Sequence, residues 1–171
     1  MEKNMKIALT GHRPERLGFN DNEEHCDWEN IRLWIADKIA EVQQIANPDT
    51  PITVYCGMAT GSDIAFGLVI SRMKDCGCNV KLCCVLPCKN YNSSHPYYNQ
   101  IKSHADEWIE LADEFYKGCD NVRDQYMVDH CHFLLAVWDR NKSGGVWSTI
   151  KKAEKAGKNI IYCPIEFLKK Q

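Results

Sequence analysis

Short apolar runs alternate with amphipathic stretches along the chain. The apolar runs have the length of buried strands and end at or beside glycine, proline or polar residues; they cover residues 6–10, 52–56, 80–86, 133–138 and 159–163. Between them, apolar residues recur at spacings of three and four, which predicts helices over residues 25–46, 62–75, 97–111, 122–132 and 146–156. A further short strand is expected at residues 114–116.

This pattern predicts an α/β protein. Strands that alternate with helices favour a mainly parallel sheet covered by helices on both faces. We therefore expect a Rossmann-like three-layer α/β/α sandwich whose sheet has about five to six strands. No repeat, low-complexity tract or linker divides the 171 residues, so residues 1–171 are expected to form a single domain. In such sheets, ligands bind beyond the carboxyl ends of the strands.

Three loops that follow predicted strands combine glycine with polar residues, at positions 10–14 (TGHRP), 57–63 (GMATGSD) and 139–145 (DRNKSGG). Glycine lets backbone N–H groups approach a ligand, and the helices after the second and third loops offer unpaired N–H groups with a partial positive charge. Arg13 adds a planar fork that matches phosphate or carboxylate. Each glycine alone could serve only a turn, and Ser62 only a helix cap. Three such loops at one sheet edge favour an anion site.

Asp63 is the candidate for acid–base chemistry, and no catalytic residue is assigned beyond it. It begins a predicted helix, where a carboxylate could bind a sugar hydroxyl, act as an acid or base, or complement the helix dipole. Asp139 directly follows a predicted strand and is expected at the ligand edge. Asp129 lies in the preceding helix, so its role depends on how that helix packs.

Ten cysteines are the unusual feature of the composition. Disulfides, a zinc site and core packing are the alternatives. The first residues lack the layout of a signal peptide, so we expect a reduced, cytoplasmic protein. Five thiols lie between residues 76 and 88, but their spacing differs from paired CxxC zinc motifs. We therefore expect no metal, thiols that fill the core, and Cys88 as the one thiol near the pocket.

Charge and hydropathy restrict the partners. The formal net charge is −2, which argues against bulk electrostatic binding of nucleic acid. The lysines at positions 151, 152, 155 and 158 are typical of a solvated helix face. No apolar run approaches the roughly 20 residues needed to span a membrane, so no membrane contact is expected.

Four stretches in order resemble the motifs of the YpsA-like branch of the SLOG superfamily, which also contains DprA and the Lonely Guy enzymes. They are residues 10–14, 57–63, 123–129 (RDQYMVD) and 137–145. The resemblance covers nearly the whole chain. It implies a Rossmann-like fold, a nucleotide or nucleotide-derived ligand, and frequent self-association, so a homo-oligomer is expected. It does not imply a particular reaction.

The loops and the resemblance together predict the ligand-binding residues. They are Thr10, Gly11, His12, Arg13, Gly57, Met58, Ala59, Gly61, Asp63, Pro87, Arg123, Met127, Asp139, Ser143, Gly144 and Gly145. The chain also departs from the family pattern. The Lonely Guy motif PGGxGTxxE ends in a glutamate that residues 143–150 lack, which argues against that mechanism. Val146 replaces a common threonine, and Asp124 adds a negative charge where the branch often has asparagine.

The loop after Pro87 carries four aromatic rings in place of the branch's glutamine–tryptophan pattern: Tyr91, His95, Tyr97 and Tyr98. These rings either stack on a base or anchor the loop.

Three functions are compatible with these loops and motifs. The preferred one is capture of a nucleotide or nucleotide-derived small molecule, by a sensor or sequestering protein without a cofactor. The alternative is a hydrolase for an N-glycosidic or phosphoester bond, with Asp63 as acid or base and Arg13 stabilising charge. DprA-like binding of single-stranded DNA ranks third, because the basic residues are scattered rather than gathered in an aromatic-lined groove.

Overall fold

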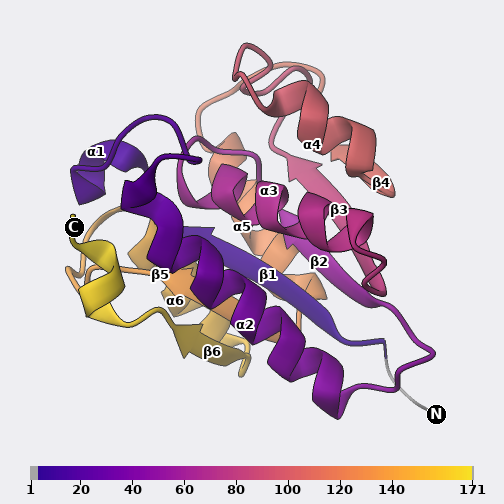
Figure 1. Cartoon of the computed structure of the whole chain (residues 1–171). Helices are drawn as coiled ribbons and strands as arrows, with labels where there is room; N and C mark the ends of the chain where they lie inside the picture. The colour runs from indigo at the N-terminus through magenta and orange to yellow at the C-terminus, as the bar shows by residue number, and fades with distance from the viewer. Residues whose placement is uncertain (1–3, 171) are drawn as a thin grey trace.

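Six parallel strands form one sheet at the centre of the computed structural model, which describes residues 4–170 (Figure 1). Every neighbouring pair of strands is parallel. From edge to edge the order is β4 (Glu107–Glu110), β3 (Val80–Leu86), β2 (Ile52–Cys56), β1 (Lys6–Gly11), β5 (Phe133–Val137) and β6 (Asn159–Tyr162). The chain runs outward from β1 to β4 and then returns to the other side of β1. The strand order therefore reverses between β1 and β5, which is where α/β sheets bind ligands.

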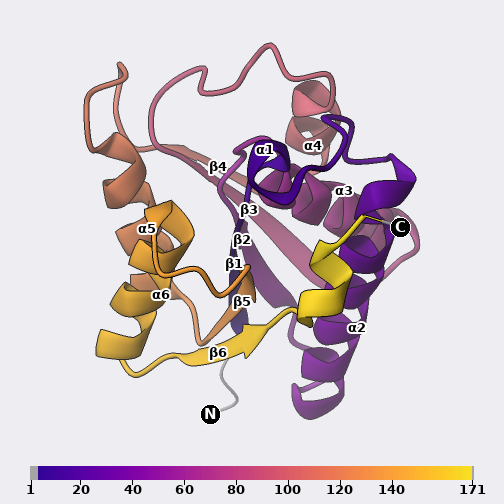
Figure 2. The same cartoon turned by 90° about the vertical axis from the view of Figure 1, so that its left-hand side faces the viewer.

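Helices cover both faces of this sheet (Figure 2). One face carries α2 (Glu29–Ile45), α3 (Ser62–Asp75) and α4 (Tyr98–His104), and the other carries α5 (Cys119–His130) and α6 (Gly144–Lys155). The central strand is buried on both sides, since Ile7, Ala8 and Leu9 have no exposed surface. The predicted three-layer α/β/α fold with a parallel sheet is confirmed. Among the described residues, no helix is both long and apolar enough to cross a membrane.

Helix α3 is buried much more completely than its amphipathic pattern suggested. All residues from 62 to 71 are buried, because the helix packs on the sheet and also contacts α2 and α4. Gly67 permits the approach of α4, since a Cβ atom at this position would lie 2.9 Å from Ile101 Cδ1. Helix α3 therefore places Asp63, in its first turn, against the centre of the sheet.

The prediction for residues 97–116 was wrong. The helix expected over 97–111 ends at His104, residues 107–110 form strand β4, and residues 114–116 form no strand. Asp106 explains the break, because its Oδ2 accepts the Leu82 amide N–H at 2.8 Å and pairs with Lys74. These contacts direct the chain alongside β3. Phe115 is 69% exposed, so the segment expected as a strand lies on the surface.

Three short helices and the start of α5 also differ from the predictions. A short helix, α1 (Pro14–Leu17), begins at the last residue of the first glycine loop and ends at Gly18 in the left-handed conformation. A 3₁₀ helix, η1 (Cys26–Trp28), precedes α2, and a second, η2 (Ile165–Leu168), follows β6. Helix α5 begins at Cys119, three residues earlier than expected. Pro14 at the first position of α1 fits its fixed φ, but four residues are too few for a periodic signal.

The cysteines in and beside the strands fill the core, as predicted. All ten cysteines are free, and the buried ones are Cys56, Cys83, Cys84, Cys88, Cys119, Cys131 and Cys163. Burial raises the pKa of Cys83 and of Cys163 to about 12, so both remain neutral thiols at pH 7. Cys88 differs from its prediction, because it is buried beside Cys119 and does not line the large cavity described below.

Candidate functional site

A cavity of about 550 Å³ lies at the carboxyl ends of the strands, beside the reversal in strand order. Its walls come from the end of β1, α1, the loop before α3 and the first turn of α3, residues 120–127 of α5, and the start of α6. The volume lies within the range of small-molecule sites. The lining residues are Leu9, Thr10, Gly11, His12, Arg13, Glu15, Arg16, Ala59, Asp63, Asp120, Arg123, Asp124, Met127, Gly145 and Val146.

Much of the predicted site is brought together around this cavity. The predicted residues that line it are Thr10, Gly11, His12, Arg13, Ala59, Asp63, Arg123, Met127 and Gly145. The predicted residues that do not line it are Gly57, Met58, Gly61, Pro87, Asp139, Ser143 and Gly144. The prediction missed Glu15, Arg16, Asp120 and Leu9 as wall residues, and it included Asp124 and Val146 only as departures from the family pattern. The only local signal for the first two was Pro14, which marks the start of α1 and so aligns Arg13 and Arg16.

Three backbone amides around the start of α3, where an anion cradle was expected, already have partners within the protein. Gly61 N–H donates to Glu23 Oε1 at 2.8 Å, and Ala59 N–H donates to Asp63 Oδ2 at 3.2 Å. Ser62 N–H donates to the His12 carbonyl. These three amides therefore join the loop to neighbouring segments and are not free to bind a ligand.

Two of the predicted cradle glycines serve chain packing. A Cβ atom at Gly11 would lie 2.4 Å from Ser62 Cβ, and one at Gly57 would lie 2.8 Å from both Arg123 Nη1 and Asp63 Oδ2. Glycine at these positions therefore lets β1 approach α3 and lets a buried charge cluster lie over β2. Neither position needs a ligand to explain it.

The start of α6 also faces the cavity. Gly145 and Val146 line the wall, and the N-cap residue Ser143 makes no side-chain hydrogen bond to the first turn. Arg16 lies against this turn, donating from Nη2 to Ser143 Oγ at 3.3 Å. The first turn of a helix carries unpaired N–H groups and a partial positive charge, which favour an anion. The start of α6 therefore keeps the features expected of an anion cradle.

A buried charge cluster forms the floor of the cavity. Arg123 donates from Nε to Asp124 Oδ1 at 2.7 Å and from Nη1 to the Gly57 carbonyl. Burial alone would lower the pKa of Arg123, but Asp124 and Asp63 hold it above its usual range, so the guanidinium stays charged. Burial raises the pKa of Asp63 to about 6, against the opposing effect of Arg123. Asp63 therefore exchanges its proton near neutral pH.

A second cluster of polar side chains, formed by His12, Arg16 and Asp139, lies on the side of the cavity near β5. Arg16 Nε donates to Asp139 Oδ2 at 2.7 Å, and His12 Nε2 lies 3.1 Å from both Oδ1 and the amide nitrogen of Asp139. Burial opposes ionisation of Asp139, yet the bonds from Arg16 and the Asn141 amide lower its pKa to about 2. Burial lowers the pKa of His12, and Asp139 only partly opposes this, so the imidazole is neutral at pH 7.

Arg13 differs from the other two lining arginines. Among residues 4–170, Arg16 and Arg123 have carboxylate partners, whereas the hydrogen bond of Arg13 goes to the Tyr91 hydroxyl at 3.2 Å. Its side chain is exposed to the cavity mouth. Arg13 is therefore the lining cation whose charge is most available to a ligand.

The aromatic residues of the β3–α4 loop act mainly as anchors. Tyr97 donates its hydroxyl to Asn22 Oδ1 at 2.7 Å, and His95 Nε2 lies 3.1 Å from Glu23 Oε1. Tyr98 packs edge-on against Trp108. Tyr91 is the exception in this loop, because it contacts Arg13 and its ring faces Arg123 with a separation of 5.7 Å.

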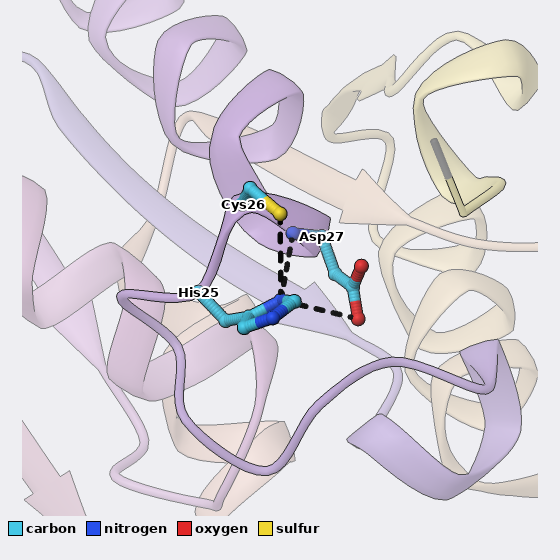
Figure 3. Close-up of side chains that lie close together, drawn as sticks. All are labelled: His25, Cys26 and Asp27. Atoms are coloured by element: carbon cyan, nitrogen blue, oxygen red, sulfur yellow. Dashed lines mark hydrogen bonds and ion pairs between the residues drawn. The ribbon is translucent and has the colours of Figure 1, made fainter.

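One group of metal-ligating side chains lies outside the cavity, at the start of η1 (Figure 3). The donor atoms of His25, Cys26 and Asp27 lie within 4.8 Å of one another. His25 Nδ1 accepts the Asp27 amide N–H at 3.2 Å, and Asp27 Oδ2 accepts the Asn20 amide N–H at 2.9 Å. The lone pair of His25 Nδ1, which a metal ion would need, therefore already accepts the hydrogen bond that caps the 3₁₀ helix. Residues 76–88 form no such group in the described part of the chain.

Comparison with known proteins identifies the family. The model of a family described as the YspA SLOG family matches residues 7–170. No curated protein matches the chain. The matched range contains the four motif stretches and every residue that lines the cavity. The chain therefore belongs to the YpsA family of SLOG proteins.

Proposed function

We propose that the protein binds a nucleotide or nucleotide-derived small molecule in the cavity at the carboxyl edge of the sheet, as a cytoplasmic sensor or sequestering protein. Membership of the SLOG family is consistent with a nucleotide-related role. The observation that carries the proposal is one cavity that joins Arg13 and the uncapped start of α6 to a set of carboxylates. The cavity thus holds hydrogen-bond donors that suit an anion beside carboxylates that can accept hydrogen bonds from hydroxyl groups. A sugar phosphate offers both an anion and hydroxyl groups.

The polar groups of the cavity suit two different parts of a nucleotide, the phosphate and the sugar. The amides of Gly145 and Val146, together with Arg13, would donate to phosphate oxygens. Asp120 and Asp124 would accept hydrogen bonds from ribose hydroxyls, since an ionised carboxylate only accepts. The apolar surface of Leu9 and Met127 lies between these polar groups.

The charge balance of the walls argues for a small ligand rather than a nucleic acid. The lining contains three arginines and four carboxyl groups, and two of the arginines are paired with aspartate. A cavity with this balance does not attract a polyanion in bulk. It can still hold one or two phosphates at Arg13 and the start of α6.

The binding proposal predicts a thermal shift with AMP, ADP-ribose, NAD or a cyclic nucleotide. Arg13→Gln should weaken the binding of the best nucleotide by about tenfold or more, because a hydrogen bond to a charged group is lost. Lys38→Gln is the control, since Lys38 pairs with Glu41 on α2, outside the cavity. Absence of a shift with every nucleotide, combined with salt-sensitive binding of single-stranded DNA, would contradict the proposal.

One observation favours hydrolysis as the second candidate function. Asp63 is 7% exposed, lines the cavity and has a pKa of about 6, so it can both hold and release a proton near neutral pH. Mass spectrometry of nucleotides incubated with the protein tests for products. Turnover that Asp63→Asn abolishes, with binding retained, would establish the enzyme. Bound nucleotide that stays intact supports a pure binding protein.

A further inference from the structure

The β3–α4 loop, residues 87–97, brings Tyr91 to the mouth of the cavity. The Tyr91 hydroxyl accepts a hydrogen bond from Arg13 Nη2 at 3.2 Å, and the Arg123 guanidinium lies 5.7 Å from the centre of the Tyr91 ring. Both arginines line the cavity, but Tyr91 itself does not. Tyr91 therefore reaches the cavity through its contacts with Arg13 and Arg123. It lies in a loop outside the glycine motifs.

Hydrogen bonds from Asn92, directly after Tyr91, anchor the loop. Asn92 Nδ2 donates to the Met58 carbonyl at 2.9 Å and to Thr60 Oγ1 at 3.1 Å, which joins the loop to the start of α3. Asn90 and Asn92 both adopt the left-handed conformation, with φ of 59° and 56°, which asparagine tolerates better than most residues. The chain therefore turns sharply before and after Tyr91, and the ring is held in place without a ligand.

A buried carboxylate strengthens the same junction. Glu23 has no exposed surface, and its Oε1 accepts the Gly61 amide N–H at 2.8 Å and lies 3.1 Å from His95 Nε2. Because His95 Nδ1 accepts the Tyr97 amide N–H, its proton lies on Nε2 and is donated to Glu23. The loop, the start of α3 and the segment before α2 thus form one rigid unit around Tyr91.

Arg13 and Tyr91 together can donate hydrogen bonds to a ligand. Arg13 uses one N–H group on Tyr91 and keeps the others, and a hydroxyl that accepts from arginine can still donate its own proton. Burial raises the pKa of Tyr91, so the hydroxyl remains protonated at neutral pH. The pair offers several donors to the same small volume, which suits an anionic oxygen.

We propose that Tyr91 is a specificity-determining residue, which binds an anionic oxygen of the ligand together with Arg13 and so selects phosphorylated over uncharged nucleosides. This inference rests on the proposed function. It assigns the phosphate of the ligand to the mouth of the cavity beside the β3–α4 loop. The sugar then faces Asp120 and Asp124 of α5.

Calorimetric titration of the full chain with ADP-ribose and with adenosine tests the inference. Tyr91→Phe keeps the ring and removes the hydroxyl, so ADP-ribose should bind about tenfold more weakly while adenosine binding is unchanged. Tyr97→Phe is the matched control, because it removes a hydroxyl from the same loop whose bond goes to Asn22. This control variant should bind both ligands as the wild type does.

Two outcomes would overturn the inference: ADP-ribose binding that Tyr91→Phe leaves unchanged, and an equal loss for ADP-ribose and adenosine. Inorganic pyrophosphate separates this result from failure of the proposed function. If the wild type binds pyrophosphate through the Tyr91 hydroxyl but binds no nucleotide, the proposed function is wrong and the anion site stands. If it binds neither, both are wrong.

Discussion

Asp63 is the residue on which the chemistry of the cavity depends most. It lies in the first turn of α3, under Gly57 and beside Arg123, and only 7% of its surface is exposed. Burial favours the neutral acid, whereas Arg123 favours the carboxylate. Together these two effects let Asp63 release its proton near pH 6. Acid–base chemistry near neutral pH, or a ligand affinity that depends on pH, would require such a group.

The raised pKa of Asp63 predicts a specific dependence of stability on pH. The folded protein retains this proton up to about pH 6, whereas the unfolded chain releases it near pH 3.8. The stabilisation is therefore fully present below pH 3.8 and is lost as the pH rises through 6, a change of about 3 kcal/mol at most. Asp63→Asn should remove it, so the difference in unfolding free energy between variant and wild type grows in favour of the variant from pH 4 to pH 7.

Urea unfolding of both proteins at several pH values measures this difference, and the contributions of other titrating groups cancel in it. Parallel curves for the two proteins would contradict the assigned environment of Asp63.

Individual site residues could be predicted only in part. Arg13, His12 and Asp63 were identified because their side chains follow strands in a parallel sheet. The role of Gly57 was misread, since only the structure reveals that Arg123 lies over it. Arg123 was chosen through the family resemblance, and its bond to the Gly57 carbonyl spans 66 positions in sequence. Local patterns carry no signal for such a contact.

At the scale of elements, α6 is the part of the site that can be tested without disturbing the fold. A Cβ atom at Gly145 would meet nothing within 4 Å, and the residue lies in the first turn of the helix. Gly145→Asp should change the unfolding free energy by less than about 1 kcal/mol, since a negative charge there suits the helix dipole. The same charge should weaken nucleotide binding by at least about tenfold through repulsion of phosphate.

Gly145→Asn is the matched control, because it has the same shape without the charge. Thermal unfolding and calorimetric titration of both variants provide the two measurements. Equal affinities for the Asp and Asn variants would show that no anion binds at the start of α6.

Most elements were predicted to within a few residues, because strands β1, β2, β3, β5 and β6 are apolar runs bounded by turn residues. The exception is the region of α4 and β4. Apolar residues there fit a helical spacing, and β4 has only four residues at the edge of the sheet. The strand forms because Asp106 binds the Leu82 amide and Lys74, which lie more than 20 positions away.

At the scale of the whole molecule, strand order creates the site. Alternation of strands and helices predicts a parallel sheet but not which strands are neighbours. Pairing of β1 with β5 brings residues 10–13 beside residues 137–146, which are far apart in sequence. The cavity lies at that junction, so its location follows from the topology more than from any one motif.

Self-association is also a property of the whole molecule, and the family resemblance predicts a homo-oligomer. Phe115, Tyr116 and Val122 are 69%, 47% and 49% exposed, so apolar side chains are available near the start of α5. Size-exclusion chromatography with light scattering should give a multiple of the 19.7 kDa chain mass. A mass of one chain at micromolar concentrations would contradict this expectation.

Nucleotide binding in this cavity is best tested by a crystal structure grown with the nucleotide that gives the largest thermal shift in the panel. We expect ligand density in the cavity at the carboxyl edge, with phosphate oxygens within hydrogen-bond distance of the Gly145 and Val146 amides or of Arg13. The sugar should contact Asp120 or Asp124. Nucleotide density at another surface, with this cavity filled only by solvent, would show that the cavity is not the nucleotide site.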